Sequence, residues 1–118
     1  MGQSLSRVPV LPWGWRSMWV IAMFDLPTDT PKARKAYATF RKSLIQDGFT
    51  MMQYSVYTRH CASIENAEVH MGRMGAAVPA SGEVRFLAIT DRQFGKIRVF
   101  TGKKRSNPPP SPAQLELF

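Results

Sequence analysis

Hydrophobic residues gather into one unbroken run near the start of the chain. The run spans Met18 to Phe24, ends in the carboxylate of Asp25 and turns at Leu26 and Pro27. It is far shorter than the roughly 20 residues of a membrane helix and has no helical periodicity, so it predicts a buried β-strand. A strand that is apolar at nearly every position must be covered on both faces. In so short a chain helices can cover only one face, and we expect a second copy of the protein to cover the other.

Two segments have the apolar spacing of helices. Thr30 and Pro31 suit the N-cap and first turn of one helix, and Gly48 suits its C-terminal end. The apolar stripe of this helix is Ala33, Ala36, Tyr37, Phe40 and Leu44. Ser63 can cap a second helix, which must end before Pro79. Its stripe is Ile64, Ala67, Met71, Met74 and Val78.

Segments rich in β-branched and aromatic residues complete the predicted secondary structure. Residues 49–60 alternate and predict a strand or a bent pair of strands, and residues 96–100 predict a short last strand after a turn at 91–95. Residues 83–90 predict another strand, with Phe86, Leu87, Ala88 and Ile89 buried. The order β-α-β-β-α-β plus an extra strand is that of an α+β ferredoxin-like sandwich, with both helices on one face of an antiparallel sheet. Its bare face agrees with the expected homodimer.

Length and composition predict one folded domain between two extensions. The 118 residues can bury a modest core, and the single Cys61 excludes an intrachain disulfide and suits the cytoplasm. We expect an N-terminal extension or flexible arm over residues 1–17, a folded domain over 18–101 and a basic, proline-rich tail over 102–118. The arm lacks the cationic start and cleavage site of a signal peptide, so we expect no targeting or membrane-spanning segment.

The charge of the chain indicates a polyanionic partner. Sixteen Lys and Arg against eight Asp and Glu give a net charge of +8, which favours nucleic acid or an anionic surface. The first helix carries five basic residues and no acidic one between positions 32 and 42. A merely soluble helix would mix the two signs, so this face favours a binding surface over a solvated one. The predicted nucleic-acid contacts are Arg34, Lys35, Arg41, Lys42, Lys103, Lys104 and Arg105.

Among the carboxylates, Asp25 is the candidate for chemistry. The sequence has no glycine-rich phosphate loop and no serine elbow. His60, Cys61 and His70 lack the spacing of a zinc site, and we expect them to be ordinary turn and helix residues. Mg²⁺ takes oxygen ligands and accelerates phosphodiester cleavage, and two copies of Asp25 facing each other across a dimer would hold it better than one. The alternative is that Asp25 only ends the strand and accepts backbone N–H bonds in the loop.

Several segments together resemble the Cas2 family of CRISPR-associated proteins. They are the strand and turn at 18–27, the helix at 34–44 and the segment 48–57, and the turn at 91–94 and the tail at 115–118 resemble variants from type II systems, which have a single large effector nuclease. The resemblance covers residues 18–118. It implies a ferredoxin-like homodimer whose last strand crosses to the partner's sheet, with Asp25 as catalytic residue and metal ligand.

The resemblance also implies a subunit of CRISPR spacer acquisition. The dimer would bridge two dimers of the Cas1 integrase and hold prespacer duplex DNA by its backbone, with the effector nuclease of the same system as a further partner. Members of the family are described as metal-dependent ribonucleases or deoxyribonucleases. One alternative is a stand-alone VapD-type ribonuclease toxin, which would share the Asp and the dimer. Another is an RNA-recognition module, but residues 83–88 do not match its aromatic strand motif.

The end of the chain has the character of a docking segment. Its expected partner-binding residues, at the tip of a proline-rich tether, are Gln114, Leu115, Leu117 and Phe118. We favour a short strand that adds to the edge of the integrase or of the neighbouring protomer. The pentapeptide at residues 114–118 also resembles the motif by which bacterial proteins bind the replication sliding clamp. The clamp is therefore the alternative partner.

Overall fold

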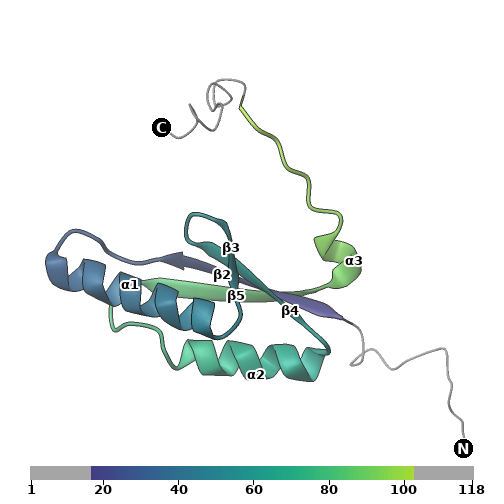
Figure 1. The fold of residues 1–118 in the computed structure, drawn as a ribbon, viewed down its shortest axis with the longest axis horizontal. Helices are drawn as coiled ribbons and strands as arrows, with labels where there is room; N and C mark the ends of the chain where they lie inside the picture. The colour runs from purple at the N-terminus through teal and green to yellow at the C-terminus, as the bar shows by residue number, and fades with distance from the viewer. Residues whose placement is uncertain (1–16, 103–118) are drawn as a thin grey trace, which may run out of the picture.

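The apolar run identified in the sequence is the central strand of an antiparallel sheet. A computed structural model describes residues 17–102 of the chain, shown as a ribbon in Figure 1. Its elements in chain order are β2 (Met18–Asp25), α1 (Pro31–Gln46), β3 (Thr50–Gln53), β4 (Val56–Cys61), α2 (Ile64–Gly75), β5 (Glu83–Thr90) and α3 (Asp91–Phe94). The strands lie in the order β3-β4-β2-β5, and every neighbouring pair is antiparallel. This is the predicted ferredoxin-like arrangement.

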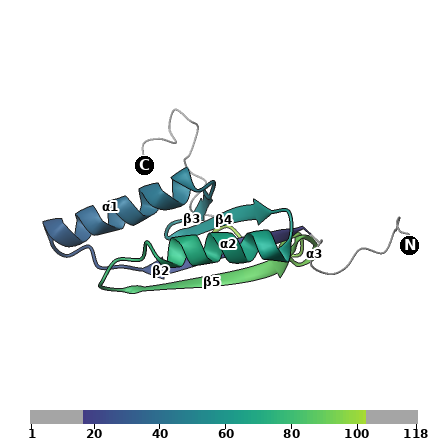
Figure 2. The same ribbon diagram turned by 90° about the horizontal axis from the view of Figure 1, so that it is seen from below.

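Strand β2 presents alternate side chains to the two faces of the sheet. Its helix-facing residues join the core and are Met18, Val20, Ala22 and Phe24. On this face the Phe24 ring meets the Phe40 ring of α1 edge-on, with 5.3 Å between the ring centroids. Helix α2 runs along β2 and β5 on the same side (Figure 2). Trp19, Ile21 and Met23 alternate with these residues and therefore point to the opposite, open face.

The helices begin where their capping residues predict. The Thr30 side chain accepts a hydrogen bond of 3.0 Å from the backbone N–H of Ala33, and Ser63 caps α2 through Asn66 in the same way. After α1, Gly48 has φ +92°, a left-handed conformation that favours glycine. Helix α2 ends at Gly75, so Val78, which the spacing placed on the helix, packs on the core from the following loop instead.

The bent segment at 49–60 is a hairpin of two strands. The turn between β3 and β4 contains Ser55 with φ +62°, and the pairing register shifts between Met51 and Gln53. Within β4 the predicted alternation holds, because Tyr57 is buried in the core while its neighbours Val56 and Thr58 face the open side.

The end of the described chain differs from the prediction in three ways. Leu87 is 48% exposed, because β5 is an edge strand whose alternate residues face the open side. The predicted turn at 91–95 contains the short helix α3, with Gly95 as its C-cap. Residues 96–100 form no strand, and Val99 and Phe100 are 82% and 85% exposed. A strand needs a neighbour for its backbone N–H and C=O groups, and no strand within residues 17–102 pairs with this segment.

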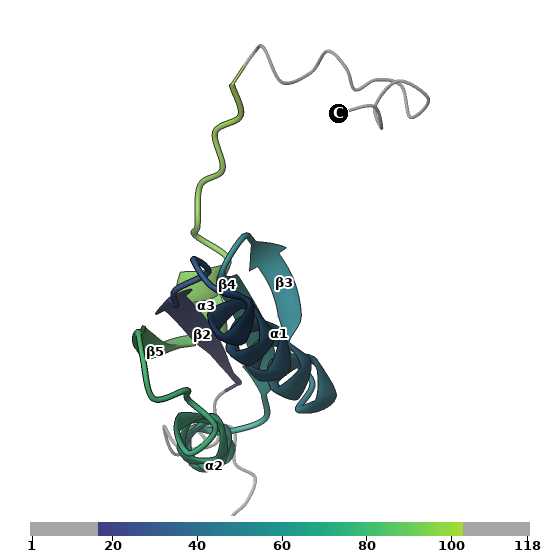
Figure 3. The same cartoon turned by 90° about the vertical axis from the view of Figure 1, so that its left-hand side faces the viewer.

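The segment after α3 leaves the domain on the side away from the two long helices (Figure 3). Apart from Ser17 and Gly102, the predicted N-terminal arm and C-terminal tail lie outside the described residues. Within residues 17–102, no helix is long and apolar enough to cross a membrane.

Candidate functional site at the end of strand β2

Asp25 is the last residue of β2 and its side chain is exposed. The next residue, Leu26, is 7% exposed and belongs to the core, so it anchors the chain where the strand ends. The Asp25 carboxylate accepts no hydrogen bond from the residues that the structure describes. The loop bonds that were the alternative explanation of this carboxylate are therefore not seen within residues 17–102.

Gly82 lets the loop before β5 pack directly on the backbone at Asp25. Its φ is +95°, and an added Cβ would come within 2.8 Å of the Asp25 carbonyl oxygen and 2.7 Å of a Leu26 methyl carbon. Contacts this short do not occur for real side chains, so any other residue would displace either the loop or the end of β2. The position of Asp25 thus depends on a glycine that lies 57 residues away in the chain, at position 82 against 25.

Strand β5 places two more charged residues beside Asp25. Asp25 pairs with Glu83 across the strands, and Met23 pairs with Arg85. Cross-strand partners project to the same face, so all three charged side chains lie at one end of the open face. An Arg85 guanidinium nitrogen, Nη1, donates to Glu83 Oε1 at 2.7 Å. Sequence reasoning missed Glu83 and Arg85, although both stand at the alternate, outward positions of β5.

The basic face of α1 is exposed, as predicted, but its residues differ in their contacts. Arg34 donates to the carbonyl oxygen of Thr28 at 3.1 Å, in the loop that follows Asp25. Arg41 donates to the hydroxyl oxygen of Tyr57 at 2.9 Å, so it ties α1 to β4. Lys35 and Lys42 make no hydrogen bond or ion pair with the described residues.

Arg34 therefore brings one end of this basic face next to the loop at Asp25. The other predicted basic contacts, Lys103, Lys104 and Arg105, lie outside the described residues. So do the predicted docking residues Gln114, Leu115, Leu117 and Phe118.

The oxygen donors at this end of the sheet suit a hard divalent cation. Mg²⁺ keeps several waters and is commonly held by one or two carboxylates together with phosphate oxygens, and Asp25 and Glu83 can supply the carboxylates. Residues 17–102 contain no group of three or more His, Cys, Asp or Glu side chains that together could hold a metal ion. A single protomer thus offers a partial set of ligands, which waters, a phosphate or a second protomer would complete.

His70 and Cys61 have structural surroundings. The His70 ring donates through Nδ1 to the Asp47 carboxylate at 2.7 Å, and Arg73 donates to the other carboxylate oxygen. Burial alone would raise the pKa of Asp47, but the hydrogen bonds from His70 and Arg73 outweigh it and hold this pKa below its ordinary value. Burial raises the pKa of the Cys61 thiol, which disfavours the reactive thiolate.

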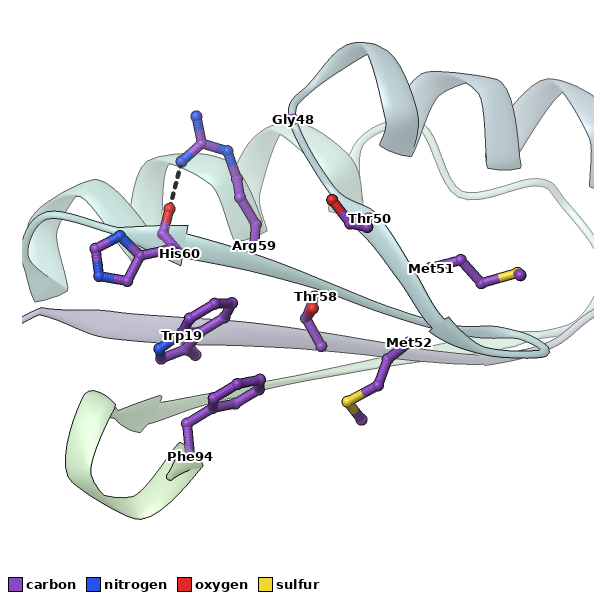
Figure 4. A pocket seen from close by; sticks show the side chains of 9 residues that line it. All are labelled: Trp19, Gly48, Thr50, Met51, Met52, Thr58, Arg59, His60 and Phe94. Atoms are coloured by element: carbon purple, nitrogen blue, oxygen red, sulfur yellow. Dashed lines mark hydrogen bonds between the residues drawn. The ribbon is translucent and has the colours of Figure 1, made fainter. Parts of the chain in front are cut away.

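A hollow on the open face lies around Trp19 (Figure 4). The Trp19 ring stacks on Phe94 of α3 with 3.9 Å between centroids, and its Nε1 donates to Asp91 at 2.7 Å. Helix α3 therefore covers one end of the face that we expected only a partner to cover. The exposed apolar residues that remain around this face are Met51, Met52 and Leu87.

Fold and site define a small ferredoxin-like protein with an exposed carboxylate at the end of its central strand and a basic helix beside it. Residues 18–97 match the family model described as CRISPR associated protein Cas2. The chain belongs to this family, which confirms the resemblance found in the sequence.

Curated relatives and a solved structure agree with this membership. The chain is 78% identical over 101 residues to the CRISPR-associated endoribonuclease Cas2 of Parvibaculum lavamentivorans, covering 86% of this chain and 100% of the relative. It is 49% identical over 104 residues to the protein of that name from Flavobacterium psychrophilum, covering 88% and 90%. A crystal structure of a Cas2 protein superimposes with a TM-score of 0.51 at 18% identity, covering 74% of this chain and 91% of that one, which supports the fold.

Proposed function

We propose that this protein acts in CRISPR spacer acquisition as a subunit that binds nucleic acid by its backbone, with a metal-dependent phosphodiesterase centre at Asp25. One observation carries the proposal: the Asp25 carboxylate is exposed at the end of β2, and Arg34 of the basic helix α1 contacts the Thr28 carbonyl in the loop that follows it. The names of the relatives, which are endoribonucleases, support RNA as one substrate.

Each part of the site has a distinct task in this proposal. A bound Mg²⁺ would supply a Lewis acid for the phosphate and lower the pKa of a coordinated water. Asp25 would hold the cation, and the closely packed Gly82 loop positions the backbone from which that carboxylate projects. Lys35 and Lys42 would attract the backbone without reading bases, because phosphate contacts carry no sequence information.

The architectural part of the proposal is a homodimer that bridges Cas1 integrase dimers and holds prespacer duplex DNA. It is supported by the apolar residues exposed on the open face and by the unpaired segment at 96–100, which would add to a partner's sheet. The type II assignment and the partners of the C-terminal tail, whether integrase, effector nuclease or sliding clamp, stay predictions.

Asp25→Asn tests the catalytic part of the proposal. Because Asn keeps the shape but lacks the charge that holds Mg²⁺, the variant should lose metal-dependent hydrolysis of RNA and DNA while its affinity for duplex DNA is retained. Cleavage would be measured on labelled substrates, with and without EDTA, in preparations purified in parallel.

Asp29→Asn is the matched control, because Asp29 is also exposed and lies in the loop four positions later. It should cleave like the wild type. Equal cleavage by the Asp25→Asn protein and the wild type would exclude Asp25 from catalysis. If the variant lost both cleavage and spacer integration by the Cas1 integrase, the architectural role would not be separate from cleavage.

A further inference from the structure

Arg85 is a basic residue in an unusual place. Strands β2 and β5 contain no other Lys or Arg, and its neighbours on the open face, Met23 and Leu87, are apolar. Arg85 is the diagonal cross-strand neighbour of Asp25, because Asp25 pairs with Glu83, two residues before it. Diagonal neighbours lie roughly 7–8 Å apart, which a long side chain can span.

The folding of a single protomer does not account for the ion pair between Arg85 and Glu83. The two side chains are 71% and 66% exposed, and ion pairs this open to solvent contribute little to stability. The pair nevertheless balances a local charge conflict, because Glu83 stands directly opposite Asp25 and like charges at such positions repel. In the protein without nucleic acid, Arg85 is thus the counterion of this acidic end of the sheet.

A guanidinium beside a candidate phosphodiesterase carboxylate has a second use. It presents planar N–H donors that match phosphate oxygens and it keeps its charge at every physiological pH. We propose that Arg85 binds a backbone phosphate of nucleic acid next to the Asp25 site, and that Glu83 holds the guanidinium in place until the phosphate takes it over. The proposal rests on the function proposed for Asp25 and adds the phosphate-binding residue of the same site.

This exchange predicts opposite effects for two neighbours on one strand. Arg85→Gln removes the charged phosphate ligand, so affinity should fall about tenfold, as expected for a hydrogen bond to a charged group. The slope of log affinity against log salt should become shallower by about 0.9 for duplex DNA or 0.7 for single-stranded RNA. Glu83→Gln removes the residue that competes for Arg85 and repels phosphate, so affinity should rise.

The measurement is fluorescence anisotropy of the full-length protein, titrated into a labelled single-stranded RNA and a labelled duplex DNA in EDTA across a salt series. Reduced affinity for either polymer on Arg85→Gln supports the proposal and names the polymer. Arg85→Lys keeps the charge, so it should keep the salt slope while binding somewhat more weakly. Arg92→Gln in α3 is the control for net charge, because Arg92 is exposed near the other end of β5.

Three results would overturn the proposal. They are an unchanged affinity and salt slope in Arg85→Gln, an equal weakening in Arg92→Gln, and a Glu83→Gln protein that binds as weakly as Arg85→Gln. Thermal unfolding of each variant separates these results from a failure to fold. If Asp25→Asn still cleaves while Arg85→Gln and Glu83→Gln shift binding in opposite directions, the catalytic assignment fails and the phosphate-binding role of Arg85 stands.

Discussion

At the residue scale, a buried carboxylate just after α1 joins three parts of the fold. Asp47 is 9% exposed and accepts hydrogen bonds from His70 and Arg73 of α2. Its carbonyl oxygen accepts a further bond of 2.8 Å from Arg59 of β4. The carboxylate therefore ties α2 to the end of α1, and its removal would leave His70 buried without its acceptor.

Asp47→Asn should destabilise the protein by about 1–3 kcal/mol at pH 7, the usual cost of leaving a buried polar group unsatisfied. Because the folded pKa of Asp47 is lowered, the unfolded chain binds more protons in acid and the contribution is complete only above the ordinary Asp pKa. The difference in the free energy of unfolding between wild type and Asp47→Asn should shrink as the pH falls below about 4. Urea unfolding at a series of pH values measures this difference.

Asp29→Asn again serves as the control, since Asp29 is exposed and should change stability little at any pH. A stability difference for Asp47→Asn that stays constant down to a pH of about 2 would contradict the assigned pKa shift.

At the element scale, α1 combines a packing surface with a charged one. Phe40 and Leu44 are buried against the sheet, while Lys35 and Lys42 point away without partners among the described residues. Arg41 belongs partly to the packing surface through its bond to Tyr57. Substitutions on one helix can therefore separate binding from stability.

Lys35→Ala combined with Lys42→Ala should weaken binding to duplex DNA of any sequence and make the salt slope shallower by about 0.9 for each phosphate that the helix no longer neutralises. The unfolding midpoint should stay unchanged, because neither side chain forms a hydrogen bond or ion pair with the rest of the described chain. Unlike the double variant, Arg41→Ala should lower the free energy of unfolding by about 1 kcal/mol, because Arg41 donates a hydrogen bond to Tyr57. Anisotropy and urea unfolding on the same preparations measure both effects.

Arg92→Ala is the control for a general decrease in charge, because Arg92 is exposed in α3, away from α1. If the double variant keeps the wild-type salt slope, α1 is a solvated surface and the DNA lies elsewhere.

At the scale of the whole molecule, one described chain leaves apolar side chains of the open face and of the segment after α3 exposed. The open face exposes Leu87, and Val99 and Phe100 extend into solvent without a strand to pair with among the described residues. Helix α3 covers only the end of this face at Trp19. A second protomer would supply both a cover for the face and a neighbour for the segment at 96–100.

Sedimentation should therefore find a dimer at micromolar concentration. Replacing Val99 and Phe100 by Asp should shift it towards the monomer, because charged side chains are costly where a partner buries them. Val69→Asp is the control, since Val69 is 53% exposed on α2. A wild-type protein that sediments as a folded monomer would contradict this prediction.

Local sequence patterns predicted most of the elements of this protein and one candidate residue. Apolar spacing and caps predicted where α1 and α2 begin, and the unbroken run predicted the central strand that ends at Asp25. These features could be predicted because they depend on residues within a few positions of one another. The sequence misjudged the burial of Leu87 and the state of residues 96–100, because both depend on which strands become neighbours.

Contacts between residues far apart in the chain could be seen only in the tertiary structure. Trp19 bonds to Asp91 across 72 positions and Asp47 to His70 across 23, and no local pattern marks such pairs. Placing β5 beside β2 brought Glu83 and Arg85 to Asp25, because in a sheet the neighbours of a side chain are set by strand order and register.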